Sequence, residues 1–196
     1  MNVFETKDIR NVALVGHVAT GKTTLAEAIV HTTGLSNRMG TIEEKNTKSD
    51  YLPDEMDRQI SIGAGLLQCE WNGTKLNIID TPGYADFVGE VIGGMRAADT
   101  AAIVIDGLTG LEVGTETAWD LCESYSMPAF MVINRAGKEH AKVPEVLAAV
   151  QERFGIKALP IQIAVNTGVG FNTIIDIVTM KQYTYDIDGN GKGKSA

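Results

Sequence analysis

The 196-residue chain has few of the residues that cross-link proteins or bind metals. Its two cysteines, Cys69 and Cys122, show no metal-ligand spacing, and we expect both to be reduced thiols in the core. The histidines His31 and His140 have no ligand partner at metal spacing. Neither a run of membrane-spanning length nor a secretory signal pattern is present, so we expect a cytoplasmic protein with no membrane partner.

Basic residues are also scarce. Lys and Arg total 17 against 25 Asp and Glu, which gives a formal net charge of −8 at pH 7. A field of this sign argues against binding of free nucleic acid through net charge, and it leaves a local contact open. Hydrophobic content of 44% and charged content of 21% are ordinary for a globular protein with one sizeable core.

The chain does contain a phosphate-binding pattern. Residues 16–23 read GHVATGKT and match G-x-x-x-x-G-K-[ST] at every fixed position, between an apolar run at 9–15 and a helix-like stretch at 23–32. Glycines let successive backbone N–H groups face an anion at a helix N-terminus, while Lys22 supplies a charge for phosphates and Thr23 a hydroxyl for Mg²⁺. The pattern indicates a nucleoside-triphosphate site; the alternative is a glycine-rich turn without a ligand. The residues expected at the nucleotide are His17, Val18, Ala19, Thr20, Gly21, Lys22, Thr23 and Thr24.

The remaining pattern predicts an α/β fold of the P-loop NTPase type, with a doubly wound, mostly parallel sheet. Apolar runs at 100–106 and 128–134 are typical of buried parallel strands, and Asn72-Gly73 predicts one antiparallel hairpin between runs at 60–71 and 74–80. After residue 158 the pattern indicates either two strand-rich pieces or a strand and a short helix. With no closing helix, we expect a core that is incomplete at its C-terminal side. Helical spacing marks residues 87–95, 118–125 and 143–154.

Residues 35–59 are polar and charged without sustained periodicity. Such a segment is longer than the loops that only connect two elements of a compact domain, and we interpret it as a functional lid or a disordered stretch. Its acids Asp54, Glu55 and Asp57 are irregularly spaced, which favours a solvated loop over a cation site.

A second motif, Asp80-Thr81-Pro82-Gly83, closes the second hairpin strand. In a P-loop enzyme an acid at a strand end holds Mg²⁺ through water, and a glycine N–H three residues later contacts the γ-phosphate. Alone, this motif also describes an ordinary turn. Its position one hairpin after the phosphate loop favours the functional interpretation.

The segments GHVATGKTT, DRQIS, NIIDTPGYADF and VINRAGKE, in this order and spacing, resemble the GTP-binding domain of translational GTPases. The best match is elongation factor G and its elongation-factor-G-like paralogues, from about residue 7 to 188. The resemblance implies an enzyme that binds GTP or GDP with Mg²⁺, hydrolyses GTP and acts at the ribosome within a larger factor. It implies a core at 1–157, the start of an inserted subdomain at 158–188 and a flexible tail at 189–196, so that the chain resembles a truncated fragment or a lone domain.

The resemblance also assigns roles. Switch I would be residues 35–61, ending in Ser61 where the family usually has a threonine that closes over Mg²⁺; the alternative is an ordinary polar residue at a strand start. Switch II would be residues 80–90. The implied metal residues are Thr23, Ser61 and Asp80; the implied catalytic residues are Lys22, Gly83 and Tyr84; and Asn134 and Arg135 would hold the base, with Asp80 and Gly83 also at the nucleotide.

Three positions depart from the family. Tyr84 replaces the water-positioning histidine, and the loss of an orienting side chain costs ~10²–10⁴ in rate, so we expect slow hydrolysis. Gly137 replaces the aspartate that accepts two hydrogen bonds from guanine, which weakens guanine preference by about two orders of magnitude. Ala19 replaces an aspartate in the phosphate loop. The family's last base-contacting motif is not recognisable, although residues 164–167 are a candidate substitute.

Three functions follow from these residues. The first is a slow GTPase switch domain of the elongation-factor-G type that the ribosome stimulates. The second is a degenerate nucleotide-binding regulatory module with little or no hydrolysis and relaxed base specificity. The third, a phosphotransferase that uses ATP, ranks last because an antiparallel hairpin carrying Asp80-Thr81-Pro82-Gly83 is a GTPase-type switch.

Overall fold

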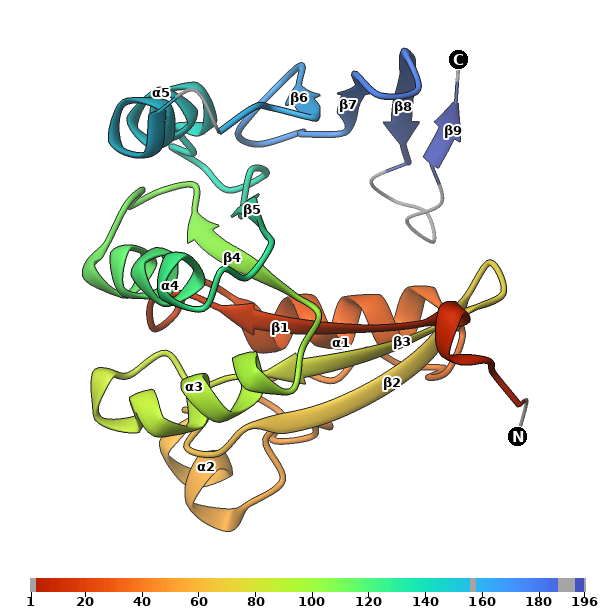
Figure 1. Cartoon of the computed structure of the whole chain (residues 1–196). Helices are drawn as coiled ribbons and strands as arrows, with labels where there is room; N and C mark the ends of the chain where they lie inside the picture. The colour runs from red at the N-terminus through yellow and green to blue at the C-terminus, as the bar shows by residue number, and fades with distance from the viewer. Residues whose placement is uncertain (1–2, 156–157, 187–192, 196) are drawn as a thin grey trace. The chain divides into compact units, whose positions relative to one another are not determined.

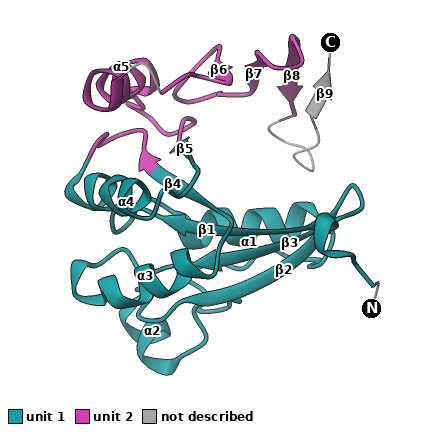
Figure 2. Cartoon of the chain, in the orientation of Figure 1, with its two compact units in different colours: residues 1–104, 112–132 teal, residues 105–111, 133–196 magenta. Residues whose placement is uncertain are grey.

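The structure is a computed structural model that describes residues 3–155, 158–186 and 193–195. It divides into two compact units: unit 1 comprises residues 1–104 and 112–132, and unit 2 comprises residues 105–111 and 133–196 (Figure 2). Of the expected tail at 189–196, residues 189–192 and 196 lie outside the described residues.

A five-stranded sheet carries the fold, in the order β2-β3-β1-β4-β5 (Figure 1). β1 pairs in parallel with β3 and β4, whereas β2 pairs antiparallel with β3. The expected mostly parallel sheet with one antiparallel hairpin is therefore confirmed. The strands are β1 (Ile9–Val15), β2 (Gly65–Trp71), β3 (Thr74–Asp80), β4 (Thr100–Asp106) and β5 (Ala129–Asn134).

The hairpin turns at Asn72 and Gly73, whose φ angles of 47° and 78° are those a two-residue turn of this kind requires. β2 begins at Gly65, five residues later than the apolar run suggested. The reason is local: the backbone N–H groups of Ile62 and Gly63 donate to the carboxylate of Glu55 instead of to a strand.

Helices cover both faces of the sheet in unit 1. On one face, α1 (Lys22–Thr32) packs through Ala26 and Val30 into a cluster that includes Ile78 of β3. The next residue, Ile79, faces the opposite side, where Gly94 of α3 (Val88–Arg96) approaches it. The other helices of unit 1 are η1 (Thr6–Asp8), α2 (Pro53–Arg58), η2 (Ala85–Phe87) and α4 (Val113–Ser124).

The two apolar runs assigned to buried strands differ in how deeply they are buried. β4 is fully buried from Ala101 onward, as a central strand should be. β5 is not: Phe130 is 44% exposed, because β5 is the last strand in the order of the sheet that the structure describes. An edge strand has one neighbour only, so burial was predicted wrongly there.

Unit 2 contains α5 (Val143–Phe154), with Pro144 in its first turn and Gly155 (φ 75°) after its end. It also holds an antiparallel sheet of order β6-β7-β8-β9. Of the two alternatives for this region, the strand-rich one is confirmed. The strands are β6 (Gln162–Ala164), β7 (Thr173–Asp176), β8 (Lys181–Tyr185) and β9 (Gly193–Ser195). Among the described residues, none of the helices has the length and apolar character needed to cross a membrane.

Candidate functional site

The phosphate loop follows β1 and ends at the first turn of α1. Gly16 lies at φ 134°, and a Cβ there would stand 2.5 Å from the carbonyl oxygen of Val104, so no other residue fits between β1 and β4. Gly21, at φ 89°, precedes the first helical residue, Lys22. The backbone therefore bends over the N-terminus of α1, the geometry that suits an anion.

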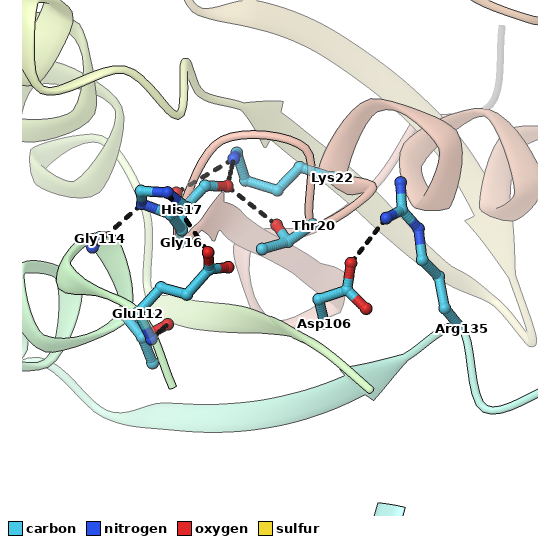
Figure 3. Close-up of polar contacts among 9 residues, drawn as sticks. Gly16, His17, Thr20, Lys22, Asp106, Glu112, Gly114 and Arg135 are labelled. Carbon is cyan, nitrogen blue, oxygen red and sulfur yellow. Dashed lines mark hydrogen bonds and ion pairs between the residues drawn. The ribbon is translucent and has the colours of Figure 1, made fainter. Parts of the chain in front are cut away.

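Inside this loop the Lys22 side chain folds back onto backbone carbonyls (Figure 3). Its Nζ donates to the oxygens of Gly16 (3.0 Å) and His17 (2.7 Å), and Thr20 Oγ1 also donates to the His17 oxygen (3.0 Å). Burial lowers the pKa of Lys22 to about 8, while the charge of Asp80 opposes this shift. A desolvated ammonium in a loop of this shape has a strong electrostatic attraction to phosphate.

The His17 ring is held by the first turn of α4 (Figure 3). Its Nδ1 lies 3.3 Å from the backbone nitrogen of Gly114 and accepts that N–H, and its Nε2 is 3.6 Å from Glu112 Oε1. A Cβ on Gly114 would stand 2.6 Å from His17 Cα, so the helix and the loop are in close contact. Among the other loop residues, Ala19 adopts a left-handed conformation (φ 61°).

Three polar side chains from distant segments meet under the loop. Thr23 Oγ1 donates to Asp80 Oδ2 at 2.7 Å and lies 3.2 Å from Ser61 Oγ. These are the three residues that the resemblance implied for the metal, and they come from α1, from the end of β3 and from the segment before β2. The contacts bring the expected switch I and switch II ends to the phosphate loop.

Two further residues at this centre were missed by sequence reasoning. Ser49 Oγ, Asp50 Oδ1 and Asp80 Oδ1 are buried and have no hydrogen-bond partner among the described residues. Unpartnered buried oxygens fit a cation, and Mg²⁺ is bound by one or two carboxylates with phosphates and water rather than by a full protein cage. In the described ranges, no group of three or more His, Cys, Asp or Glu could hold a metal ion by itself.

The electrostatics of the centre point the same way. Burial raises the pKa of Asp80 to about 6. The Thr23 and Ser49 hydroxyls and the charge of Lys22 oppose this shift, and the charge of Asp50 adds to it. Burial also raises the pKa of Asp50; the Ser61 hydroxyl opposes this shift, and the charges of Glu55 and Glu27 add to it. Lys22 supplies only part of the countercharge to these carboxylates, and a divalent cation would supply more.

The turn after β3 lies directly against the phosphate loop. A Cβ on Gly83 would stand 2.6 Å from Val18 Cα and 2.7 Å from Lys22 Nζ. Only a glycine backbone approaches so closely, which is what contact with a loop-bound γ-phosphate would need. The next residue, Tyr84, is 41% exposed and immediately precedes η2.

The region expected to hold a base belongs to unit 2. Arg135 adopts φ 60°, and its Nη1 donates to Asp106 Oδ2 at 2.6 Å (Figure 3). The other Asp106 oxygen accepts the N–H of Leu108, and Asn134 Oδ1 accepts the N–H of Arg135. Asp106 is 5% exposed and was not predicted from sequence, although its place at the end of β4 is a signal of the same kind as that of Asp80.

Gly137 is exposed and has room for a side chain. A Cβ there would lie 3.6 Å from Phe171 Cβ, an ordinary contact. The loop before Phe171 contacts the residue before Gly137, because Gly168 N–H donates to the Ala136 oxygen at 2.8 Å.

The expectation of solvated acids at 54–57 is wrong for one of the three. Glu55 is 2% exposed, and its carboxylate accepts the backbone N–H groups of Leu52, Ile62 and Gly63 at 2.9–3.1 Å. A carboxylate can be buried when it receives several amide donors. Asp57, in contrast, is exposed and pairs with Lys45 at 2.7 Å.

Comparisons with known proteins agree with this geometry. The family model described as the Elongation factor Tu GTP binding domain matches residues 7–188. Elongation factor G of Gluconobacter oxydans (strain 621H) is 35% identical over 178 residues, which are 91% of this chain and 25% of that protein. Elongation factor G of Granulibacter bethesdensis (strain ATCC BAA-1260 / CGDNIH1) is 34% identical over 186 residues, 95% of this chain and 27% of that protein.

A crystal structure of a protein from Thermus thermophilus superimposes with a TM-score of 0.86 at 35% identity and covers 96% of this chain and 28% of that one. The chain spans about a quarter of the length of the curated relatives it matches.

Proposed function

Because the chain belongs to the family of GTP-binding domains typified by elongation factor Tu, with elongation factor G among its relatives, we propose that it is a Mg²⁺-dependent switch domain that hydrolyses GTP slowly. In this proposal switch I is residues 35–61 and switch II residues 80–90, within a core at 1–157. Residues 158–188 begin an inserted subdomain.

One observation carries the proposal. Thr23 Oγ1 contacts both Asp80 (2.7 Å) and Ser61 (3.2 Å), so the phosphate loop and the two segments assigned as switches converge on one hydroxyl. In a glycine-rich turn without a ligand, the burial of a carboxylate and two hydroxyls would cost free energy with no compensating interaction.

Each residue at this centre has a role in the proposal. Lys22 moves from the carbonyls of Gly16 and His17 to the β- and γ-phosphates, and the Gly83 N–H contacts the γ-phosphate. Thr23, Ser61 and Asp80 would hold the Mg²⁺, directly or through water. The metal neutralises the charge that develops on the phosphate oxygens.

The rate of hydrolysis depends on Tyr84. A phenol can accept or donate one hydrogen bond but is essentially uncharged at neutral pH, so it orients an attacking water poorly. Its 41% exposure leaves the side chain accessible to a partner. We expect low intrinsic turnover and, for the full-length factor, stimulation by the ribosome.

The base is assigned to Asn134 and Arg135. The Arg135 guanidinium is flat and fixed by Asp106, which suits contact with the face of a base. His17, Val18, Ala19, Thr20, Gly21 and Thr24 complete the proposed contacts, around the phosphates.

A competition titration tests the proposal. Labelled GDP in Mg²⁺ buffer is displaced in turn by GTP, GDP, ATP and GMP, and GTP turnover is measured beside that of Lys22→Ala. We expect Mg²⁺-dependent binding and slow turnover that Lys22→Ala abolishes. Turnover no higher than that of Lys22→Ala would contradict a GTPase.

A second function is favoured by the exposed Gly137, which has no acceptor for guanine. In it the chain is a regulatory module that binds nucleotides with relaxed base preference and hydrolyses little or none. Equal competition by ATP and GTP, with no turnover, would support this second function. Restoration of turnover by Tyr84→His would support it further.

A further inference from the structure

A buried carboxylate of α1 fastens the middle of the switch I segment. Glu27 is 1% exposed, and its two oxygens accept backbone N–H groups eight residues apart: Oε2 from Gly40 at 3.2 Å and Oε1 from Lys48 at 2.5 Å. Neither donor belongs to a helix or strand. The contact thus joins an irregular segment to the helix that begins at the phosphate loop.

The backbone is shaped for this contact. A Cβ on Gly40 would stand 2.7 Å from Glu27 Oε2 and 2.7 Å from the Asn46 oxygen, so a side chain at position 40 would displace the carboxylate or the segment. Asn46 Oδ1 also accepts the N–H of Thr41 at 2.7 Å, which closes residues 41–46 into a compact turn. Residues 40–48 are therefore held by α1 and by themselves.

The following residues are held differently. Glu55 gathers the N–H groups of Leu52, Ile62 and Gly63, all within residues 52–63. Ser49 Oγ and Asp50 Oδ1 lie buried without partners among the described residues. Residues 49–63 therefore contain buried polar atoms that a cation would satisfy, whereas the Glu27 contacts to residues 40–48 need no ligand.

We propose that Glu27 is a positioning residue that divides switch I in two: residues 40–48 stay anchored to α1 in every nucleotide state, and residues 49–63 open and close with Mg²⁺ and the γ-phosphate. This inference rests on the proposed function for its second half only. Charge-assisted hydrogen bonds from two amides stabilise the anchored half without any ligand. The anchor shortens the moving part and keeps Ser61 within reach of Thr23.

Hydrogen exchange on the full chain tests the division. The protein is measured without nucleotide, with Mg²⁺ and GDP, and with Mg²⁺ and a non-hydrolysable GTP analogue. We expect residues 40–48 to exchange equally slowly in all three states and residues 49–63 to become slow only with the analogue. Nucleotide-dependent exchange at 40–48 that follows the change at 49–63 would overturn the proposal.

Variants identify the cause. Glu27→Gln is expected to speed exchange at 40–48 by about tenfold or more in all states, because loss of charge weakens both hydrogen bonds. Glu43→Gln, at an exposed acid of the same segment, is the matched control and leaves the exchange rate unchanged. An unchanged rate at 40–48 in folded Glu27→Gln would overturn the proposal.

The anchor can still be tested if Glu27→Gln does not fold or if the chain binds no nucleotide. Gly40→Ala displaces the carboxylate without altering its charge, and it should reproduce the effect of Glu27→Gln if that variant fails to fold. A chain that binds no nucleotide would contradict the proposed function alone, because the nucleotide-free measurement still tests the anchor. Slow exchange at 40–48 in Gly40→Ala would count against the anchor.

Discussion

At the scale of single residues, the absence of a side chain at Gly137 bears on how the proposed site would recognise a base. Position 137 is exposed and a Cβ there makes only an ordinary contact with Phe171 at 3.6 Å, so an aspartate can be accommodated. We predict that Gly137→Asp raises the ratio of GDP to ADP affinity by about 100-fold, because a carboxylate there accepts two hydrogen bonds from guanine. Competition titration measures this ratio.

Gly137→Ala is the control, since it adds the Cβ without the acceptor, and it should leave the ratio as in the wild type. A folded Gly137→Asp protein with an unchanged ratio would show that the base does not approach residue 137.

Asp80 links stability to pH. Burial raises the pKa of Asp80 to about 6, above its unfolded value near 3.8. Between these two values the folded state binds more protons than the unfolded state, so stability falls as pH rises from about 4 to about 6. Above pH 6 the burial of ionised Asp80 lowers the free energy of unfolding by an amount on the order of 2–3 kcal/mol, for a shift of this size.

We predict that Asp80→Asn removes this part of the pH dependence and stabilises the chain at pH 7 in EDTA, while it weakens Mg²⁺-dependent nucleotide binding. Urea unfolding at several pH values measures the first effect. Asp86→Asn, at an exposed acid in η2, is the control. A steep fall in stability from pH 4 to 6 that persists in Asp80→Asn would locate the titration elsewhere.

At the scale of elements, α3 contains glycines with opposite roles. A Cβ on Gly94 would stand 2.9 Å from Thr81 Cγ2 and 3.0 Å from Ile79 Cγ2, whereas one on Gly93 would meet nothing within 4 Å. We predict that Gly93→Ala stabilises the chain by about 0.5–1 kcal/mol through helix propensity. Gly94→Ala should destabilise it by about 1–3 kcal/mol through overpacking. Denaturant unfolding of this matched pair measures both, and changes of the same sign would contradict the packing of α3 on β3.

Elements with strong local signals were predicted from the sequence with accurate bounds. β1 and β4 coincide with their apolar runs, and the Asn72-Gly73 hairpin turns where expected. The predictions that failed concern contacts between segments far apart in the sequence. β5 is an edge strand, and β2 starts later than predicted because the N–H groups of Ile62 and Gly63 donate to Glu55. A spacing pattern holds no information on which strand lies beside which, or on where a carboxylate finds its donors.

At the scale of the whole molecule, the same limit applies to the site. The motifs predicted that Thr23 and Asp80 belong together, and the family resemblance implied that Ser61 joins them; the structure brings all three into contact. The buried carboxylates of Glu27 and Asp106 were not foreseen, because Glu27 accepts from Gly40 and Lys48 and one oxygen of Asp106 accepts from Arg135, all far along the chain. The end of an apolar run marks Asp106 as a candidate, but the sequence does not show which donors a buried carboxylate accepts from.

The ligand acts on the molecule as a whole through mass action. In Mg²⁺ buffer we predict that GDP at one hundred times its Kd raises the free energy of unfolding by about 2.7 kcal/mol. Pyrophosphate at the same free concentration should raise it less, because it engages the phosphate loop but has no base for Asn134 and Arg135. Unfolding in urea with each ligand measures both increments.

In Lys22→Ala, neither GDP nor pyrophosphate should raise the free energy of unfolding, since Lys22 is the cation of the phosphate loop. Lys138→Ala, at an exposed lysine, should keep both increases. Equal increments from pyrophosphate and GDP would remove Asn134 and Arg135 from the proposed site. Increments that persist in Lys22→Ala would instead place the phosphates elsewhere, because the buried Lys22 ammonium could not then be their partner.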